Sequence, residues 1–158
     1  LDTVDGLVIP GGESTTITKL MDIYGLSAII KERVACGMPL WGTCAGMIVV
    51  SHHVLGDCIE PLDLIDMDVR RNAFGRQIDS FEADLTVSYL DGGPFHAVFI
   101  RAPWIERIGP DVELVTKLEN GTPVAARQNN VLVTAFHPEL TQDYRFHQLF
   151  LEFAIVGK

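Results

Sequence analysis

One cysteine stands between two glycines at the junction of two apolar segments, and this arrangement limits the folds open to the chain. Residues 42–46 read GTCAG, with MPLW before them and MIVV after them. A strand that turns sharply into a helix can hold its pivot residue in a strained conformation only where the neighbouring residues lack bulk. The pattern therefore predicts a nucleophile elbow at Cys44, with a short strand before it and a helix over about residues 45–54 after it.

Length and composition narrow the class of protein. A chain of 158 residues is the size of one domain and can bury about two-thirds of its unfolded surface. Although 47% of the residues are hydrophobic, no apolar run approaches the roughly 20 residues that cross a bilayer. The formal net charge of −9 opposes a nucleic-acid surface, which needs clustered Lys and Arg. We therefore expect a soluble protein without a nucleic-acid or membrane partner.

The three cysteines point to a reducing compartment. Cys36, Cys44 and Cys58 form neither a C-x-x-C motif nor an even disulfide set, so we expect a cytoplasmic location. The adjacent pair His52 and His53 points to opposite sides and makes a poor metal site, even with an acid and a cysteine nearby, so no metal is expected. The chain enters an apolar strand directly at Leu1, and we expect a native segment before it.

Hydrophobic periodicity in the first half alternates between short strands and helices. Apolar strands are expected at residues 7–9 and 39–41, and helices from residue 14 or 15 and over residues 26–34. Ser27 is placed to cap the second helix and Gly37 to end it. Fully apolar strands between helices are typical of a parallel sheet covered on both faces.

The second half reads as antiparallel. Residues 81–89 alternate apolar and polar, a Gly-Gly-Pro turn leads to a strand at 95–100, and a meander runs through 112–118, 124–127 and 131–136. An amphipathic helix closes the chain at about 144–156. We predict one α/β domain over residues 1–158, with a flavodoxin-like open sheet, a parallel core, antiparallel strands added in the second half, and helices on both faces.

A histidine and a carboxylate follow the last apolar strand. Residues 136–140 read FHPEL, and in extended backbone His137 and Glu139 share one face. Glu139 can then hold one imidazole nitrogen while the other faces Cys44. Because both motifs lie just past the carboxyl end of a predicted strand, where open parallel sheets place their sites, we predict that they meet.

A third loop lies at another junction of strand and helix. Residues 10–14 read PGGES, which is a plain turn or a loop whose backbone N–H groups approach a developing oxyanion. In the second interpretation the N–H groups of Gly12 and Ala45 form an oxyanion hole. A phosphate loop is less favoured, because the Walker lysine and the full G-x-G-x-x-G pattern are absent.

Four motifs, taken together, resemble a known family. PGGEST (10–15), GTCAGM (42–47), RRNAFGRQ (70–77) and FHPELT (136–141) occur in the order and at the spacing seen in class I (triad) glutamine amidotransferases. The chain is similar over essentially its whole length to the glutaminase subunits of pyridoxal 5'-phosphate synthase. Members begin with a further strand and helix, carrying a G-L-Q-G-like loop, before the position of Leu1. The resemblance therefore marks this chain as N-terminally incomplete.

The resemblance assigns a role to each site residue. It implies that Cys44 is the nucleophile, His137 the general base and acid, and Glu139 the carboxylate that orients His137. It implies that L-glutamine is held by the following positions: Gly12, Glu13, Ser14, Arg71, and the backbone around Ile100 and Arg101. A guanidinium suits an α-carboxylate, although by itself Arg71 would be interpreted as a solvated strand end.

The resemblance also implies a reaction and a partner. L-Glutamine is hydrolysed to glutamate and ammonia without a metal or organic cofactor, and the ammonia passes to a pyridoxal 5'-phosphate synthase subunit for vitamin B6 synthesis. Two alternatives stay open. A cysteine hydrolase of other amides, esters or thioesters would share the elbow, although in α/β-hydrolases the acid lies between nucleophile and histidine in the chain. A catalytically silent regulatory subunit would share the fold.

Overall fold

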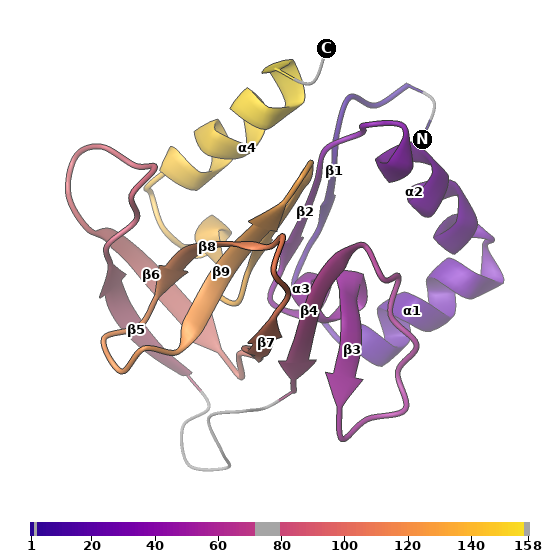
Figure 1. Cartoon of the computed structure of the whole chain (residues 1–158), viewed down its shortest axis with the longest axis horizontal. Coiled ribbons are helices and arrows are strands. Elements are labelled where there is room, and N and C mark those ends of the chain that lie inside the picture. Colours follow the sequence, from indigo (N-terminus) through magenta and orange to yellow (C-terminus); the bar gives the residue numbers. More distant parts are fainter. Residues whose placement is uncertain (2, 72–79, 157–158) are drawn as a thin grey trace.

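The largest sheet has a parallel centre, as predicted. The computed structural model describes residues 1, 3–71 and 80–156 (Figure 1). Within them the sheet order is β1 (Leu7–Ile9), β2 (Leu40–Thr43), β10 (Val131–Thr134), β9 (Pro123–Gln128) and β8 (Glu113–Lys117). β1 and β10 both pair with β2 in parallel, whereas β9 and β8 continue the sheet antiparallel. The expected parallel core with an antiparallel addition is therefore confirmed.

Helices cover both faces of this sheet. Figure 1 shows α1 (Ser14–Ile23) and α2 (Leu26–Ala35) on one side of β1 and β2, and α4 (Arg145–Val156) on the other. Successive residues of β2 face opposite sides of the sheet, so each side contacts a different layer of helices. Trp41 faces α4 and packs against Phe146, with 6.4 Å between ring centroids. Gly42 faces the opposite layer, where the backbone of α3 (Ala45–Val50) lies against it.

The start of α2 differs from the prediction, while its end agrees. Ser27 lies inside the helix and donates to Asp22 Oδ1 at 2.9 Å, and Gly25 occupies the capping position with a left-handed φ of 66°. Only two residues separate α1 from α2, so the chain reverses through a glycine and has no room for an extended cap. At the other end Gly37, with φ of 94°, donates to the carbonyl of Val34 and closes the helix.

The helix after Cys44 is shorter than the predicted 45–54. α3 ends at Val50, and the chain passes directly into β3 (Ser51–Leu55). All six residues of α3 are buried, and the Ser51 hydroxyl donates to the carbonyl of Ile48 at 2.8 Å, which completes the last turn. His52 and His53 are exposed in β3. A continued apolar helix would carry these two polar side chains into a layer that is buried on all sides.

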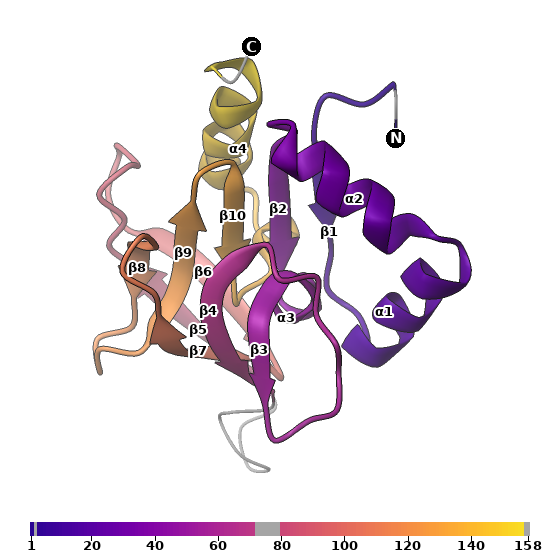
Figure 2. The same ribbon diagram turned by 45° about the vertical axis from the view of Figure 1, so that its right-hand side comes forward.

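A second, smaller sheet was not predicted. β3 pairs in parallel with β4 (Ile65–Arg70), which pairs antiparallel with β7 (Trp104–Ile108), as Figure 2 shows. β5 (Ser80–Leu85) and β6 (Phe95–Ile100) form the predicted antiparallel pair, although β5 stops at Leu85 and does not reach residue 89. The motif at 70–77 is described only at Arg70 and Arg71, and the rest lies outside the described residues.

An aromatic cluster joins α4 to the end of the central sheet. Phe146 contacts Phe95 and Phe136 edge to face, with centroids 4.7 and 5.1 Å apart. All three rings are fully buried. His137, which follows Phe136 in the chain, donates its backbone N–H to the carbonyl of Val98 in β6 at 2.9 Å. The cluster therefore fixes the segment that carries the predicted histidine.

In the part of the chain that the structure describes, every helix is too short or too polar to cross a membrane.

Gly46 offers a test of how α3 is seated on β1. A Cβ atom at Gly46 would overlap the carbonyl oxygen of Ile9 and lie 2.8 Å from its carbonyl carbon. Replacing Gly by Ala in a helix ordinarily stabilises it by about 1 kcal/mol. For Gly46→Ala we expect the opposite sign, a loss of about 3 kcal/mol in the free energy of unfolding, because backbone must shift to admit the methyl group. Urea denaturation measures the change.

Gly25→Ala serves as the comparison. Its added Cβ meets no atom within 4 Å, so this variant loses only the roughly 1–2 kcal/mol of a left-handed residue. A Gly46→Ala variant as stable as the wild type would contradict this account of the packing.

Candidate active site

The predicted elbow has the strained geometry that its glycines permit. Cys44 has φ of 49° and ψ of −106°, at the junction of β2 and α3. A Cβ atom on Gly42 would lie 2.7 Å from the backbone of Gly46, so the turn closes only with glycine at this position. The backbone N–H of Cys44 donates to the carbonyl of Thr134 in β10 at 2.8 Å. Strain of this kind in a residue with a side chain is typical of functional sites.

His137 and Glu139 pair, but through a different backbone than expected. His137 Nδ1 lies 2.8 Å from Glu139 Oε1. β10 ends at Thr134, and His137 precedes the 3-10 turn η1 (Pro138–Leu140) instead of continuing an extended strand. Pro138, which is favoured in a first helical turn, starts η1 and brings Glu139 back toward the ring. The remaining ring nitrogen, Nε2, is left for other partners.

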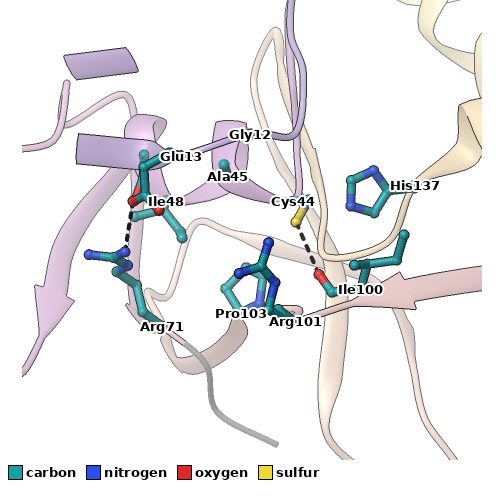
Figure 3. Close-up of a pocket in the computed structure, with 11 residues that line it drawn as sticks. Gly12, Glu13, Cys44, Ala45, Ile48, Arg71, Ile100, Arg101, Pro103 and His137 are labelled. Atoms are coloured by element: carbon teal, nitrogen blue, oxygen red, sulfur yellow. Dashed lines mark hydrogen bonds and ion pairs between the residues drawn. The ribbon is translucent and has the colours of Figure 1, made fainter. Parts of the chain in front are cut away.

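The imidazole of His137 faces the thiol of Cys44 (Figure 3). Hydrogen bonding with the Cys44 side chain is the largest cause that raises the pKa of His137 to about 9. Burial opposes this rise, and the hydrogen bond that the ring donates to the Glu139 carboxylate adds to it. Cys44 Sγ also lies 3.8 Å from the carbonyl oxygen of Ile100, which accepts the thiol hydrogen when the sulfur is protonated. The Cys44 thiol and the His137 imidazole can therefore exchange a proton inside a protected site.

Gly11 contacts the imidazole and was not among the predicted site residues. A Cβ atom at Gly11 would overlap His137 Cε1 and lie 3.1 Å from Nδ1. The loop after β1 therefore forms one wall of the space that the ring occupies. The sequence contained a signal for this contact. Parallel strands end at the same edge of a sheet, so the loop after residues 7–9 and the segment after residues 131–136 are expected to lie close together.

One pocket of about 340 Å³ contains nearly all the predicted site residues. It is lined by Gly12, Glu13, Ser14, Cys44, Ala45, Ile48, Arg71, Ile100, Arg101, Pro103 and His137. Glu139 lies behind His137, outside the lining, while Ile48 and Pro103 were not predicted. Arg101 is the second strained residue of the site, with φ of 43°. A pocket of this volume suits a small molecule.

Two carboxylates hold Arg71 at the edge of this pocket. Its Nη2 donates to Glu13 Oε1 at 2.8 Å, and its Nη1 donates to Asp57 Oδ2. Asp57 is the acid that lies near His52 and His53 in the sequence, but in the structure His52 pairs with Asp63. No group of three or more His, Cys, Asp or Glu side chains is arranged to bind a metal ion within the described residues.

Comparison with known proteins supports both the fold and the family resemblance. The model of the SNO glutamine amidotransferase family matches residues 1–156. The pyridoxal 5'-phosphate synthase subunit PdxT of Dehalococcoides mccartyi is 56% identical over 156 residues, which are 98% of this chain and 80% of that protein. PdxT of Acidothermus cellulolyticus is 55% identical over 157 residues, covering 96% of this chain and 76% of the relative.

A solved structure agrees with these sequences. The crystal structure of a glutamine amidotransferase, 48% identical, superposes with a TM-score of 0.90 over 96% of this chain and 79% of its own. The resemblance drawn from the four motifs is thereby confirmed, as is the predicted α/β fold class. The chain belongs to the SNO glutamine amidotransferase family.

Proposed function

We propose that this chain hydrolyses the side-chain amide of L-glutamine and supplies the ammonia to a synthase subunit that makes pyridoxal 5'-phosphate. Family membership and relatives named as subunits of that synthase support the reaction. The observation that carries the proposal is that Cys44 and His137 line one pocket, while Glu139 pairs with the imidazole of His137 from outside it. We further propose that residues 1–158 form a single class I glutamine amidotransferase domain.

The chemistry follows from the positions of these groups. Cys44 Sγ attacks the amide carbon after passing its proton to His137, and the N–H groups of Gly12 and Ala45 stabilise the oxyanion. The tetrahedral adduct collapses as His137 protonates the leaving nitrogen, which departs as ammonia and leaves a γ-glutamyl thioester. His137 then takes a proton from water, the resulting hydroxide attacks the thioester, and the proton returns to sulfur as glutamate leaves. Glu139 keeps the ring oriented and stabilises the imidazolium.

The charged end of glutamine is assigned to the other side of the pocket. Arg71 offers N–H donors to the α-carboxylate, and the Glu13 carboxylate offers acceptors to the α-ammonium. Ser14 and the backbone around Ile100 and Arg101 complete the binding site. The substrate then spans the distance between this charged region and the thiol.

The nature of the product accounts for a partner. Ammonia released into water is protonated and loses its nucleophilicity, so a glutaminase of this kind is useful when an acceptor enzyme receives the ammonia directly. We therefore propose a hetero-oligomer with the synthase subunit, in the cytoplasm.

Replacing the nucleophile tests the reaction. With the synthase subunit present, we expect Cys44→Ala to lower glutamine turnover by at least about 1000-fold, because no thioester forms. Cys36 is an exposed free thiol, and Cys36→Ala should leave turnover unchanged. Release of glutamate and ammonia measures both variants.

An electrophilic glutamine analogue distinguishes the alternatives. Labelling of the wild type at Cys44 supports a glutaminase. A label that forms only with other amide or thioester mimics would favour a different cysteine hydrolase, and a failure to label in the presence of the synthase subunit would favour a silent regulatory subunit.

The raised pKa of His137 gives a second prediction. We expect a ring titration near pH 9 in the wild type, and a lower pKa in both Cys44→Ala and Glu139→Gln, with the larger fall in Cys44→Ala because Cys44 is the larger cause. The pKa in the folded protein lies above the ordinary value of 6.5 in the unfolded chain, so its contribution to stability is complete below pH 6.5 and is lost as the pH rises through about 9. NMR titration of the imidazole measures its pKa in the wild type and in both variants. A larger fall in Glu139→Gln would contradict the prediction.

A further inference from the structure

Arg71 is held between two carboxylates that belong to different parts of the fold. Glu13 lies in the loop between β1 and α1, and Asp57 lies in the loop between β3 and β4. Each takes a separate terminal nitrogen of the guanidinium, Glu13 at Nη2 and Asp57 at Nη1 (Figure 3 shows the Glu13 contact). The two contacts are therefore independent, and one can break while the other stays.

Asp57 is the better fixed of the two. Its Oδ1 accepts the backbone N–H of Cys58 at 2.8 Å, so both carboxylate oxygens are engaged, and Gly56, with φ of 75°, forms the turn just before it. Its side chain is 27% exposed, whereas that of Glu13 is 55% exposed. Besides Arg71, Glu13 accepts a hydrogen bond from the hydroxyl of Thr15, at the same oxygen. Glu13 is consequently the partner that can leave Arg71 at lower cost.

The charges at this edge of the pocket explain why one partner must leave. Arg71 and its two carboxylates carry a net charge of about −1 as a group, which disfavours a third carboxylate on Arg71 while both stay, and the other arginine of the pocket, Arg101, is not part of this group. A zwitterionic substrate removes the difficulty, because its α-ammonium can take Glu13 while its α-carboxylate takes the released Nη2 of Arg71. Throughout this exchange Asp57 keeps Nη1, so the long arginine side chain does not have to be ordered again at an entropic cost.

We propose that Asp57 is a positioning residue that holds the Arg71 guanidinium in place for the α-carboxylate of the substrate. The inference rests on the proposed function and extends it to a residue that does not line the pocket. Asp57 acts through Arg71, and the thiol, the imidazole and the oxyanion donors lie on other elements. Its loss should therefore weaken glutamine binding without slowing the chemical steps.

The test uses Asp57→Asn in the complex with the synthase subunit. The amide is nearly isosteric but lacks the negative charge, so we expect the KM for L-glutamine to rise about tenfold while kcat stays within about twofold of the wild type. Asp57→Glu, which restores the carboxylate, should recover part of the loss. An unchanged KM, or a fall in kcat as large as the rise in KM, would overturn the proposal.

A double-mutant cycle separates positioning from a general effect on the loop. In an Arg71→Ala background, Asp57→Asn should leave kcat/KM unchanged, because the residue through which Asp57 acts is gone. If Asp57 only stabilises its loop, the same loss persists in both backgrounds and the proposal fails.

Asp68→Asn is the matched control. Asp68 accepts from Arg107 Nε at 2.8 Å in the small sheet, and its side chain is 19% exposed, but neither residue lines the pocket. This variant should keep the wild-type KM and kcat, and a rise in KM equal to that of Asp57→Asn would overturn the proposal. If the wild-type complex itself shows no glutaminase turnover, the proposed function fails and this inference falls with it, whereas an active wild type with an unaffected Asp57→Asn variant refutes the inference alone.

Discussion

The rest of the site depends on the backbone contact that seats α3 against β1 and β2. Gly46 lies directly on the carbonyl of Ile9, and Gly42 lies under the turn, so a side chain at either position would push the helix away from the sheet. Close seating forces the turn at Cys44 into a left-handed conformation, which directs the thiol into the pocket. The reactive group is therefore positioned by main chain, which moves less than a side chain held by other side chains.

Strand order brings the other parts to this thiol. β2 lies between β1 and β10, all three are parallel, and their carboxyl ends reach the same edge of the sheet. Cys44 follows the middle strand, the loop with Gly11 and Gly12 follows one neighbour, and His137 follows the other. The contact of Gly11 with the imidazole shows how closely these loops meet. Cys44 and His137, more than ninety residues apart in the chain, are thus brought to one edge of the sheet.

The elements that the sequence predicted well are those whose signal is local. Short apolar runs indicated the strands at residues 7–9 and 95–100, and a glycine indicated the end of α2. These signals do not depend on which distant segments pack against them. β4 carried a comparable signal, since Ile65, Met67 and Val69 are buried at alternating positions, but its meaning depends on pairing with β3. β3 itself was not predicted, because the expected helix was extended to Val54 across Ser51, His52 and His53. The bend at residues 137–139 was missed because Pro138 permits both an extended strand and a first helical turn.

Asp57 shows why part of the site could not be predicted from motifs. It belongs to none of the four, and its partner Arg71 lies fourteen residues further along the chain. The parallel register of β3 and β4 sets Leu55 beside Arg70, so the residues that follow each strand end meet there. The small sheet thus brings Asp57 to Arg71, while the central sheet carries the thiol and the imidazole. The two parts of the site meet where Arg71 contacts Glu13 in the loop after β1, one residue past Gly12, the proposed oxyanion donor.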